Sequence, residues 1–315
     1  MKTKKLTALL LVLAMLASLL SACRIASVGE RKPGEDGPSR MMFWKVTDNA
    51  GGELYLLGAI HVGDKSMYPL PKIVTDAYES ADLLAVEADV VAMERDRKAM
   101  AELSEIFIYT DGTTIRDHLP AELYAEARAY LEEIGRYSAA LDYMHPAMWT
   151  SLLDLEISEA CGLDDRYGVD RHFLDRAYDD GKEIYELESV KMQYEMLAGF
   201  SDEISAFLLR ASLTDREAQK DELRQLYELY KSGDFAAFGA YVAEEPEGLT
   251  AEELALYAEY TYEMVDARNV GMAEQALELL ASGKVCFYIV GAAHMVGETG
   301  LVNVLTEAGC TVEQQ

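Results

Sequence analysis

The stretches LYLLGAIHVGD at residues 54–64 and VCFYIVGAAHMVG at residues 285–297 decide the fold of this chain. Each begins with a short apolar run, continues through the pattern Gly-x-x-His, and reaches a Val-Gly pair soon after the histidine. The continuous apolar run at 285–290 is typical of a strand that is covered on both faces of a sheet. The two stretches therefore predict two strands, each delivering a histidine where the strand ends: His61 and His294.

Two further candidate strands end on a glutamate. The apolar run LLAV at residues 83–86 leads into Glu87, and the weaker run IYEL at residues 184–187 leads into Glu188. Ligands of open α/β sheets bind outside the carboxyl ends of the strands. The four titratable side chains at these strand exits are therefore expected to converge on one crevice.

The remaining pattern is that of one α/β domain over residues 41–315. Alternating residues at 43–47 and 53–57, with turn residues between them, predict an initial hairpin. Apolar residues at helical spacing follow Pro120, and no strand candidate is found at about residues 191–282. We predict a mostly parallel central sheet with flanking helices and a large helical insertion at about 191–282.

Composition excludes several classes of protein. The chain has 315 residues, with 28 Lys and Arg against 56 Asp and Glu, and a formal net charge of -28. A surface this acidic repels phosphate backbones, so we expect no nucleic-acid partner. Three cysteines remain after Cys23, an odd number that gives no disulfide framework. Cys286 lies in an apolar run and is expected to be a buried thiol.

The N-terminus is predicted to be a targeting segment. Residues 1–22 combine lysines with an apolar run, and Leu-Ser-Ala-Cys at residues 20–23 is similar to a bacterial lipobox. We expect cleavage before Cys23, lipidation of its thiol, and a flexible tether at residues 23–40. The protein would then be lipid-anchored on the extracytoplasmic face of the cell membrane. The alternative is an uncleaved single-span anchor.

Two imidazoles and one carboxylate form a recognisable ligand set. His61, His294 and Glu87 would suit Zn, Mn, Co or Fe(II) and leave positions open for water and substrate. Glycine after a strand allows both a sharp turn and the close approach of a ligand. A single Gly-x-x-His is more often a core histidine, so the argument depends on two copies at two strand exits.

Five blocks of sequence, taken in order, resemble the TraB/GumN family, to which the Tiki proteases are similar. They are LYLLGAIHVGD, LLAVEAD, YGVDRHFLDRAYDDGKEIYELES followed by Gln193, DARNVGMAEQALELL, and VCFYIVGAAHMVGETGLVNVLTEAGCTV. The resemblance implies a metal-dependent peptidase with Mn or Co, and an architecture similar to ChaN-like and erythromycin-esterase-like folds. It places the family's two histidines at His61 and His294 and its glutamate at Glu87. Asp170, Glu188, Arg268 and Asn269 stand in the other blocks.

These residues give a hypothesis of metal-dependent hydrolysis. His61, His294 and Glu87 would hold a divalent ion (Mn, Co or Zn). Glu188 or Asp170 would be the general base or a fourth ligand, and Arg268 would orient a substrate carboxylate or offset oxyanion charge. The structural alternatives are that Asp170 caps a helix and that Arg268 forms a surface ion pair.

Other histidines and tyrosines are weaker candidates. His118 and His145 stand at helix-boundary signals and are expected to be structural, while His172 is an outside candidate. Four tyrosines could line a peptide groove or pack between helices: Tyr241, Tyr257, Tyr260 and Tyr262. The rival function is a non-catalytic lipoprotein that captures an extracellular peptide or pheromone in the same crevice. A third possibility is a cell-envelope scaffold.

Overall fold

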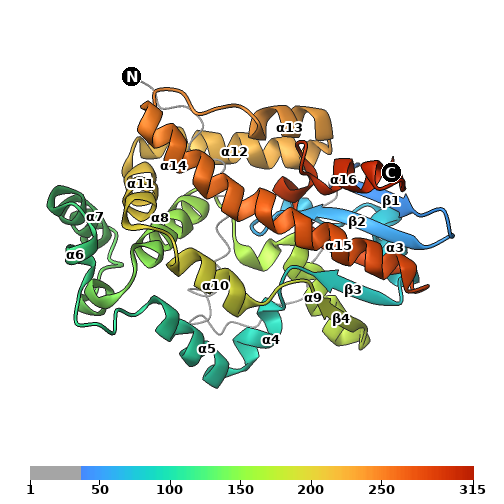
Figure 1. Ribbon diagram of the computed structural model, residues 1–315, viewed down its shortest axis with the longest axis horizontal. Helices are drawn as coiled ribbons and strands as arrows, with labels where there is room; N and C mark the ends of the chain where they lie inside the picture. The colour runs from blue at the N-terminus through green and yellow to red at the C-terminus, as the bar shows by residue number, and fades with distance from the viewer. Residues whose placement is uncertain (1–36) are drawn as a thin grey trace.

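The computed structural model describes residues 37–315 (Figure 1). The predicted signal peptide at 1–22, the predicted lipidation site Cys23 and the predicted tether up to residue 36 lie outside the described residues. Residues 37–40, where that tether would end, contain no helix or strand. No helix between residues 37 and 315 combines the length and the apolar character needed to cross a membrane.

A six-stranded sheet with the order β4-β3-β5-β2-β1-β6 forms the centre of the fold. The pairs β4–β3, β3–β5 and β5–β2 are parallel, whereas β1 is antiparallel to both β2 and β6. This confirms the predicted α/β class with a mostly parallel sheet. The strands are β1 (Phe43–Thr47), β2 (Glu53–Ala59), β3 (Leu83–Val86), β4 (Glu183–Glu186), β5 (Cys286–Gly291) and β6 (Thr311–Gln314).

The strand positions differ from the prediction in small ways. The initial hairpin is confirmed, although β2 continues beyond residue 57 to Ala59. β4 begins one residue before the predicted run 184–187, and β5 begins one residue after the predicted run 285–290. β6 was not predicted, because Val312 is its only apolar residue. Its strand conformation comes from pairing with β1, which the local sequence does not reveal.

Helices cover both faces of β5, as its apolar run predicts. On one face, the Phe287 ring packs against Tyr78 of α3 (Lys72–Ser80) and Phe173 of α9 (Val169–Asp180). Tyr288 points to the other face, where its hydroxyl donates to the carbonyl oxygen of Met272 in α15 (Ala267–Ala281). All residues of β3 and β5 are buried, including the predicted core thiol Cys286.

Two long stretches of chain between strands are helical. The first, between β3 and β4, contains α4 (Val90–Arg95), α5 (Arg97–Ser104), α6 (Ile115–His118), α7 (Ala121–Glu133) and α8 (Pro146–Ala160), ahead of α9. The second, between β4 and β5, contains α10 (Val190–Ala198), α11 (Asp202–Leu213), α12 (Arg216–Ser232), α13 (Phe235–Val242), α14 (Ala251–Thr261), the π-helix η6 (Tyr262–Asp266) and α15. A last helix, α16 (Leu301–Glu307), precedes β6. The prediction mentioned one helical insertion, whereas the β3–β4 stretch is just as helical.

Parts of both stretches pack into a helical layer beside the sheet. Helices α6, α7, α8 and α11 lie together at the left of Figure 1, away from the strands. Trp149 of α8 is fully buried in their apolar core. Asp154 of α8 is also buried, and the Ser212 hydroxyl of α11 donates to its Oδ1 at 3.2 Å. Burial raises the pKa of Asp154 to about 7, so this carboxyl group is largely protonated in mildly acidic solution.

Asp154 makes the stability of the helical layer dependent on pH. A carboxyl group whose pKa is higher in the folded state contributes stability at low pH that is lost as the pH rises from about 4 through about 7. Asp154→Asn keeps a hydrogen-bond acceptor for Ser212 and carries no charge. We expect it to raise the free energy of unfolding at pH 8 relative to the natural protein by a few kcal/mol, at about 1.4 kcal/mol per pKa unit.

Urea denaturation of both proteins at about pH 4 and about pH 8 measures this difference. Asp221→Asn, at a side chain that is 81% exposed, is the control. A difference between Asp154→Asn and the natural protein that is equal at the two pH values contradicts the prediction.

Candidate functional site

The carboxyl ends of four parallel strands meet at one edge of the sheet. Because the strand order is β4-β3-β5-β2, the side chains that follow these strands are, in that order, Glu188, Glu87, His294 and His61. Pairing between the β3 and β4 segments continues past the strands, where the backbone N–H of Glu188 donates to the carbonyl oxygen of Glu87 at 2.8 Å. The four strand-exit side chains named from the sequence are therefore neighbours in the structure.

Gly291, the last residue of β5, leaves a space around which three of these side chains meet. A Cβ atom here would lie 3.3 Å from Oε1 of Glu87, 3.5 Å from Nε2 of His61 and 3.6 Å from Cδ2 of His294. The φ angle of Gly291 is -53°, which any residue adopts. Glycine at this position therefore provides close approach, and the chain enters a 3-10 helix (Ala292–Met295) directly after it without a left-handed residue at Gly291.

His61 is held by a carboxylate from α9. Its Nδ1 lies 2.8 Å from Oδ2 of Asp170. The start of α9 is also bonded to the segment before His61, because the backbone N–H of Val169 donates to the carbonyl oxygen of Ile60 at 3.0 Å. The alternative that Asp170 caps its helix is wrong, because Gly168 occupies the N-cap position and Asp170 lies in the first turn.

The Asp170 carboxylate also sets the charge of His61. Burial by itself disfavours the imidazolium, but the neighbouring carboxylate outweighs it and raises the pKa of His61 to about 9. The side chains of His61 and Asp170 are 18% and 22% exposed, whereas those of Glu87, Glu188, Arg268 and His294 are 7% exposed or less. Solvent thus reaches the site from the side of His61 and Asp170.

His294 is oriented by an amide from α15. Its Nδ1 lies 2.7 Å from Oδ1 of Asn269. Because an amide oxygen only accepts hydrogen bonds, Nδ1 carries the ring proton and Nε2 keeps a free lone pair. This Nε2 is buried and has no hydrogen-bond partner. Burial lowers the pKa of His294 to about 4, so the ring is neutral at neutral pH.

Glu87 is an ionised carboxylate between the histidines and Arg268. The backbone N–H of Gly291 donates to its Oε1 at 2.5 Å, and Nη2 of Arg268 donates to its Oε2 at 2.6 Å. Burial opposes ionisation, but the attraction of Arg268, with contributions from both histidines, lowers the pKa of Glu87 to about 2. Oε1 of Glu87 lies 3.8 Å from Nε2 of His294.

Arg268 is buried, so the alternative of a surface ion pair is wrong. Its guanidinium binds both Glu87 and Glu188 and also donates to the carbonyl oxygen of Met264. Gln193, which the sequence placed in a motif without a role, donates its amide to Oε2 of Glu188 at 2.8 Å. The only sign of this contact in the sequence is the position of Gln193, five residues after Glu188 in the helix that follows it.

The site offers two buried donor atoms close enough to share a metal ion. Within residues 37–315, no three His, Cys, Asp or Glu side chains form a ready metal-binding group. The unpaired Nε2 of His294 and Oε1 of Glu87 are nevertheless close enough for one ion at about 2.1 Å from each. Both histidines use Nδ1 for an oxygen of a neighbouring side chain, as metal-bound histidines usually do. These residues therefore fit a divalent ion.

The remaining histidine and tyrosine candidates lie in structural contacts. His118 contacts Asp202 and Thr113, and His145 accepts the N–H of Ala147 at the start of α8. His172 packs its ring against Tyr68. Tyr241 and Tyr260 are buried, Tyr257 packs against the core beside them, and Tyr262 is 56% exposed. Helix packing therefore accounts for three of the four tyrosines.

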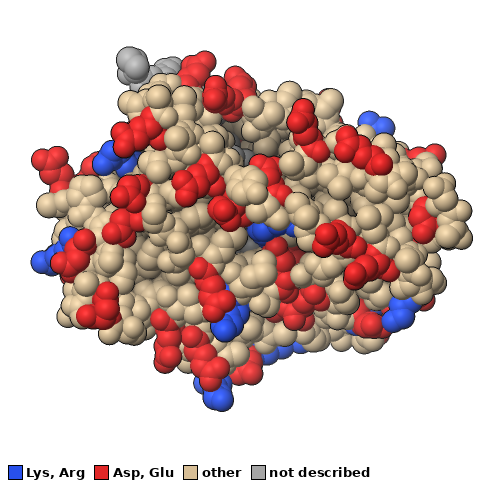
Figure 2. All heavy atoms as spheres, in the orientation of Figure 1, with Lys and Arg blue, Asp and Glu red and all other residues tan. Residues whose placement is uncertain are grey.

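Acidic side chains outnumber basic ones on the surface. Figure 2 shows Asp and Glu side chains over the whole visible face, with Lys and Arg at fewer places.

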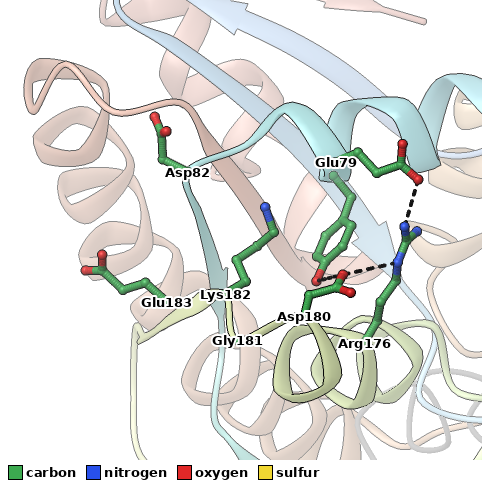
Figure 3. A pocket seen from close by; sticks show the side chains of 8 residues that line it. Glu79, Asp82, Arg176, Asp180, Gly181, Lys182 and Glu183 are labelled. Carbon is green, nitrogen blue, oxygen red and sulfur yellow. Dashed lines mark hydrogen bonds and ion pairs between the residues drawn. The ribbon is translucent and has the colours of Figure 1, made fainter.

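A separate pocket lies at the opposite end of the sheet. Figure 3 shows this pocket, of about 590 Å³, beside the start of β3 and β4. Three of its charged groups pair with one another, Arg176 contacting Glu79 at 2.8 Å and Asp180 at 3.5 Å. It shares no residue with the site at the carboxyl ends of the strands.

Three known proteins have similar sequences; two are named as uncharacterized and one as a metalloprotease. The chain is 27% identical to the uncharacterized protein YbaP of Escherichia coli (strain K12) over 165 residues, 52% of this chain and 58% of the relative. It is 28% identical to YbaP of Shigella flexneri over 156 residues, 49% of this chain and 55% of the relative. It is 24% identical to metalloprotease TIKI2 of Xenopus tropicalis over 307 residues, 82% of this chain and 57% of the relative.

The chain thus spans a little over half the length of each of these relatives. No solved structure matches it significantly. The sequence profile of the TraB/PrgY/gumN family matches residues 42–314, which is most of the chain and includes every residue of the site. The chain belongs to the TraB/PrgY/gumN family.

Proposed function

We propose that this protein is a divalent-metal-dependent hydrolase acting on peptides or proteins outside the cytoplasm. The observation that carries the proposal is Nε2 of His294, which is buried beside Oε1 of Glu87 and has no partner. A buried polar atom without a hydrogen bond costs about 1–3 kcal/mol. A bound cation would remove this cost.

The chain's own residues have distinct roles in this proposal. Nε2 of His61, Nε2 of His294 and Oε1 of Glu87 would hold Mn, Co or Zn, and Asp170 and Asn269 orient the two rings. When bound, the ion polarises a carbonyl group and lowers the pKa of a water molecule. Of the two carboxylates considered as base, Asp170 keeps a buried oxygen, Oδ1, without a hydrogen-bond partner, whereas Glu188 is bonded to Arg268 and Gln193.

Two points support peptides as substrates: the name of one relative and the predicted location of the protein outside the cytoplasm. The name of the Xenopus relative states a metalloprotease, at 24% identity. The predicted lipidation of Cys23 would place the domain on the extracytoplasmic face of a membrane. Kinship of the fold with ChaN-like and erythromycin-esterase-like proteins belongs to the same proposal.

Metal analysis tests the proposal directly. The protein purified without chelators should hold about one equivalent of Mn, Co or Zn per chain. His61→Ala and Glu87→Gln remove a ligand and should reduce both the bound metal and peptide hydrolysis to background. His118→Ala, a histidine outside the site, is the control and should keep both.

Less than about a tenth of an equivalent, with none regained on adding these metals, overturns the proposal. The non-catalytic alternative predicts a different pattern. Peptide capture would persist in Glu87→Gln, and the natural protein would cleave nothing.

A second variant tests the space over Gly291. In Gly291→Ala, the added methyl group would lie between Glu87, His61 and His294 at contact distances of 3.3 to 3.6 Å. We expect the variant to fold but to lose at least about tenfold in metal affinity, because the methyl group occupies the position that the donor atoms face. Gly271→Ala is the control, since a Cβ atom there meets no neighbour within 4 Å. Equal metal affinities of the two variants in calorimetric titration contradict the prediction.

A further inference from the structure

Arg268 joins the two glutamates of the site to the first turn of α15, which lies at the carboxyl ends of the strands. Nε of Arg268 donates to Oε1 of Glu188 at 2.9 Å, and Nη2 donates to Oε2 of Glu188 at 2.8 Å and to Oε2 of Glu87 at 2.6 Å. The three side chains are between 4% and 7% exposed. The guanidinium therefore has a fixed orientation and is the counter-charge for both carboxylates.

The hydrogen bonds of Glu188 do not suit a base or a metal ligand. Both of its oxygens accept from Arg268, and Oε2 also accepts from Gln193. The donors at its two oxygens are Arg268 and Gln193, whereas a metal ligand or a general base needs an oxygen that faces the ion or a water molecule. Glu188 also follows β4, which lies beyond β3 and its Glu87 in the strand order, away from the strands that precede both histidines.

The π-helix η6 gives Arg268 a second anchor. At the end of η6, the N–H of Ala267 donates to the carbonyl oxygen of Tyr262, five residues earlier. A π-helical turn contains one extra residue. The side chains of the following helix are therefore rotated by about 100° around the helix axis. Nη1 of Arg268 donates to the carbonyl oxygen of Met264 within this turn, at 2.8 Å. Asn269, the next residue, orients His294.

We propose that Glu188, Gln193 and Arg268 form a positioning unit that holds Glu87 with Oε1 facing the histidines, and that Glu188 is neither a metal ligand nor the general base. Arg268 fixes Oε2 of Glu87, and the Gly291 N–H fixes its rotation from the other side. Glu188 acts only through Arg268. This inference rests on the proposed metal-dependent function.

Metal titration of the full-length chain tests the positioning unit. Glu188→Gln should keep the metal stoichiometry of the natural protein but weaken Mn²⁺ affinity by about 10- to 100-fold, the usual loss when an outer partner of a ligand is removed. At saturating Mn²⁺, the pH profile of peptide hydrolysis should keep its shape. If Glu188→Gln binds no Mn²⁺, Glu188 is a metal ligand, and if its pH profile loses one limb, Glu188 is the general base. Either result overturns the inference, and so does an unchanged Mn²⁺ affinity.

Gln193→Leu is the milder variant, in case Glu188→Gln does not fold. It removes, at nearly constant volume, the amide that donates to Oε2 of Glu188 at 2.8 Å and to Oε2 of Glu87 at 3.5 Å. It should weaken Mn²⁺ affinity several-fold; unchanged affinity in this variant also overturns the inference. Gln219→Leu is its matched control, because Gln219 is equally buried and donates to the carbonyl oxygens of Ala211 and Thr214 far from the site. It should lower thermal stability and leave Mn²⁺ affinity unchanged.

The same titration separates the two proposals. A natural protein that binds no Mn²⁺, Co²⁺ or Zn²⁺ overturns the proposed function and with it the positioning role. A natural protein that binds metal, with variants of equal affinity, overturns the positioning role alone.

Discussion

A buried guanidinium between two buried carboxylates is the interaction on which the rest of the site depends. Glu87 and Glu188 follow adjacent parallel strands, so their like charges are forced together in a region that excludes water. Removing one partner from such a buried network costs about 3–5 kcal/mol, because a charge is left without compensation. Arg268 supplies that compensation because the first turn of α15 lies at the carboxyl ends of the strands, while the rest of the helix packs along one face of the sheet.

The two Gly-x-x-His histidines illustrate how neighbours decide the chemistry of identical motifs. Asp170 reaches His61 from α9, on one face of the sheet, and raises its pKa to about 9. Asn269 reaches His294 from α15, on the other face, and being neutral leaves burial to lower the pKa to about 4. In the protein without a metal ion, one ring is therefore cationic and the other neutral at neutral pH, although both follow parallel strands that pair directly. A metal ion at Nε2 of His61 would displace the proton from that nitrogen.

Three unpaired polar atoms lie at this edge of the sheet. Of the eight buried side-chain atoms without a hydrogen-bond partner in residues 37–315, three belong to site residues: Nε2 of His294, Nδ2 of Asn269 and Oδ1 of Asp170. Such atoms are rare in folded proteins, and three of them on groups that orient or flank one crevice are consistent with a site shaped for binding at some expense of stability. The rigid layers on both sides of the sheet maintain this arrangement, since α9 and α15 are fixed by aromatic and hydrogen-bond contacts with β5.

The sequence by itself determined the central strands and the residues that leave them. The apolar runs at 83–86 and 285–290 are covered on both faces, and such strands need no alternation to be recognised. The strand at 53–57 was recognised by its alternation, and Tyr55 is indeed only partly buried. The sequence alone could not show β6, because its mostly polar residues form a strand only by pairing with β1. Nor could it show the orientation of Asp170 or the burial of Arg268, because short-range patterns give a helix start for the first and a surface charge for the second. Tertiary structure alone brought Glu87 and Glu188, about a hundred residues apart in the chain, onto one guanidinium. Contacts between distant segments depend on how layers pack, and local sequence patterns carry no information about that packing.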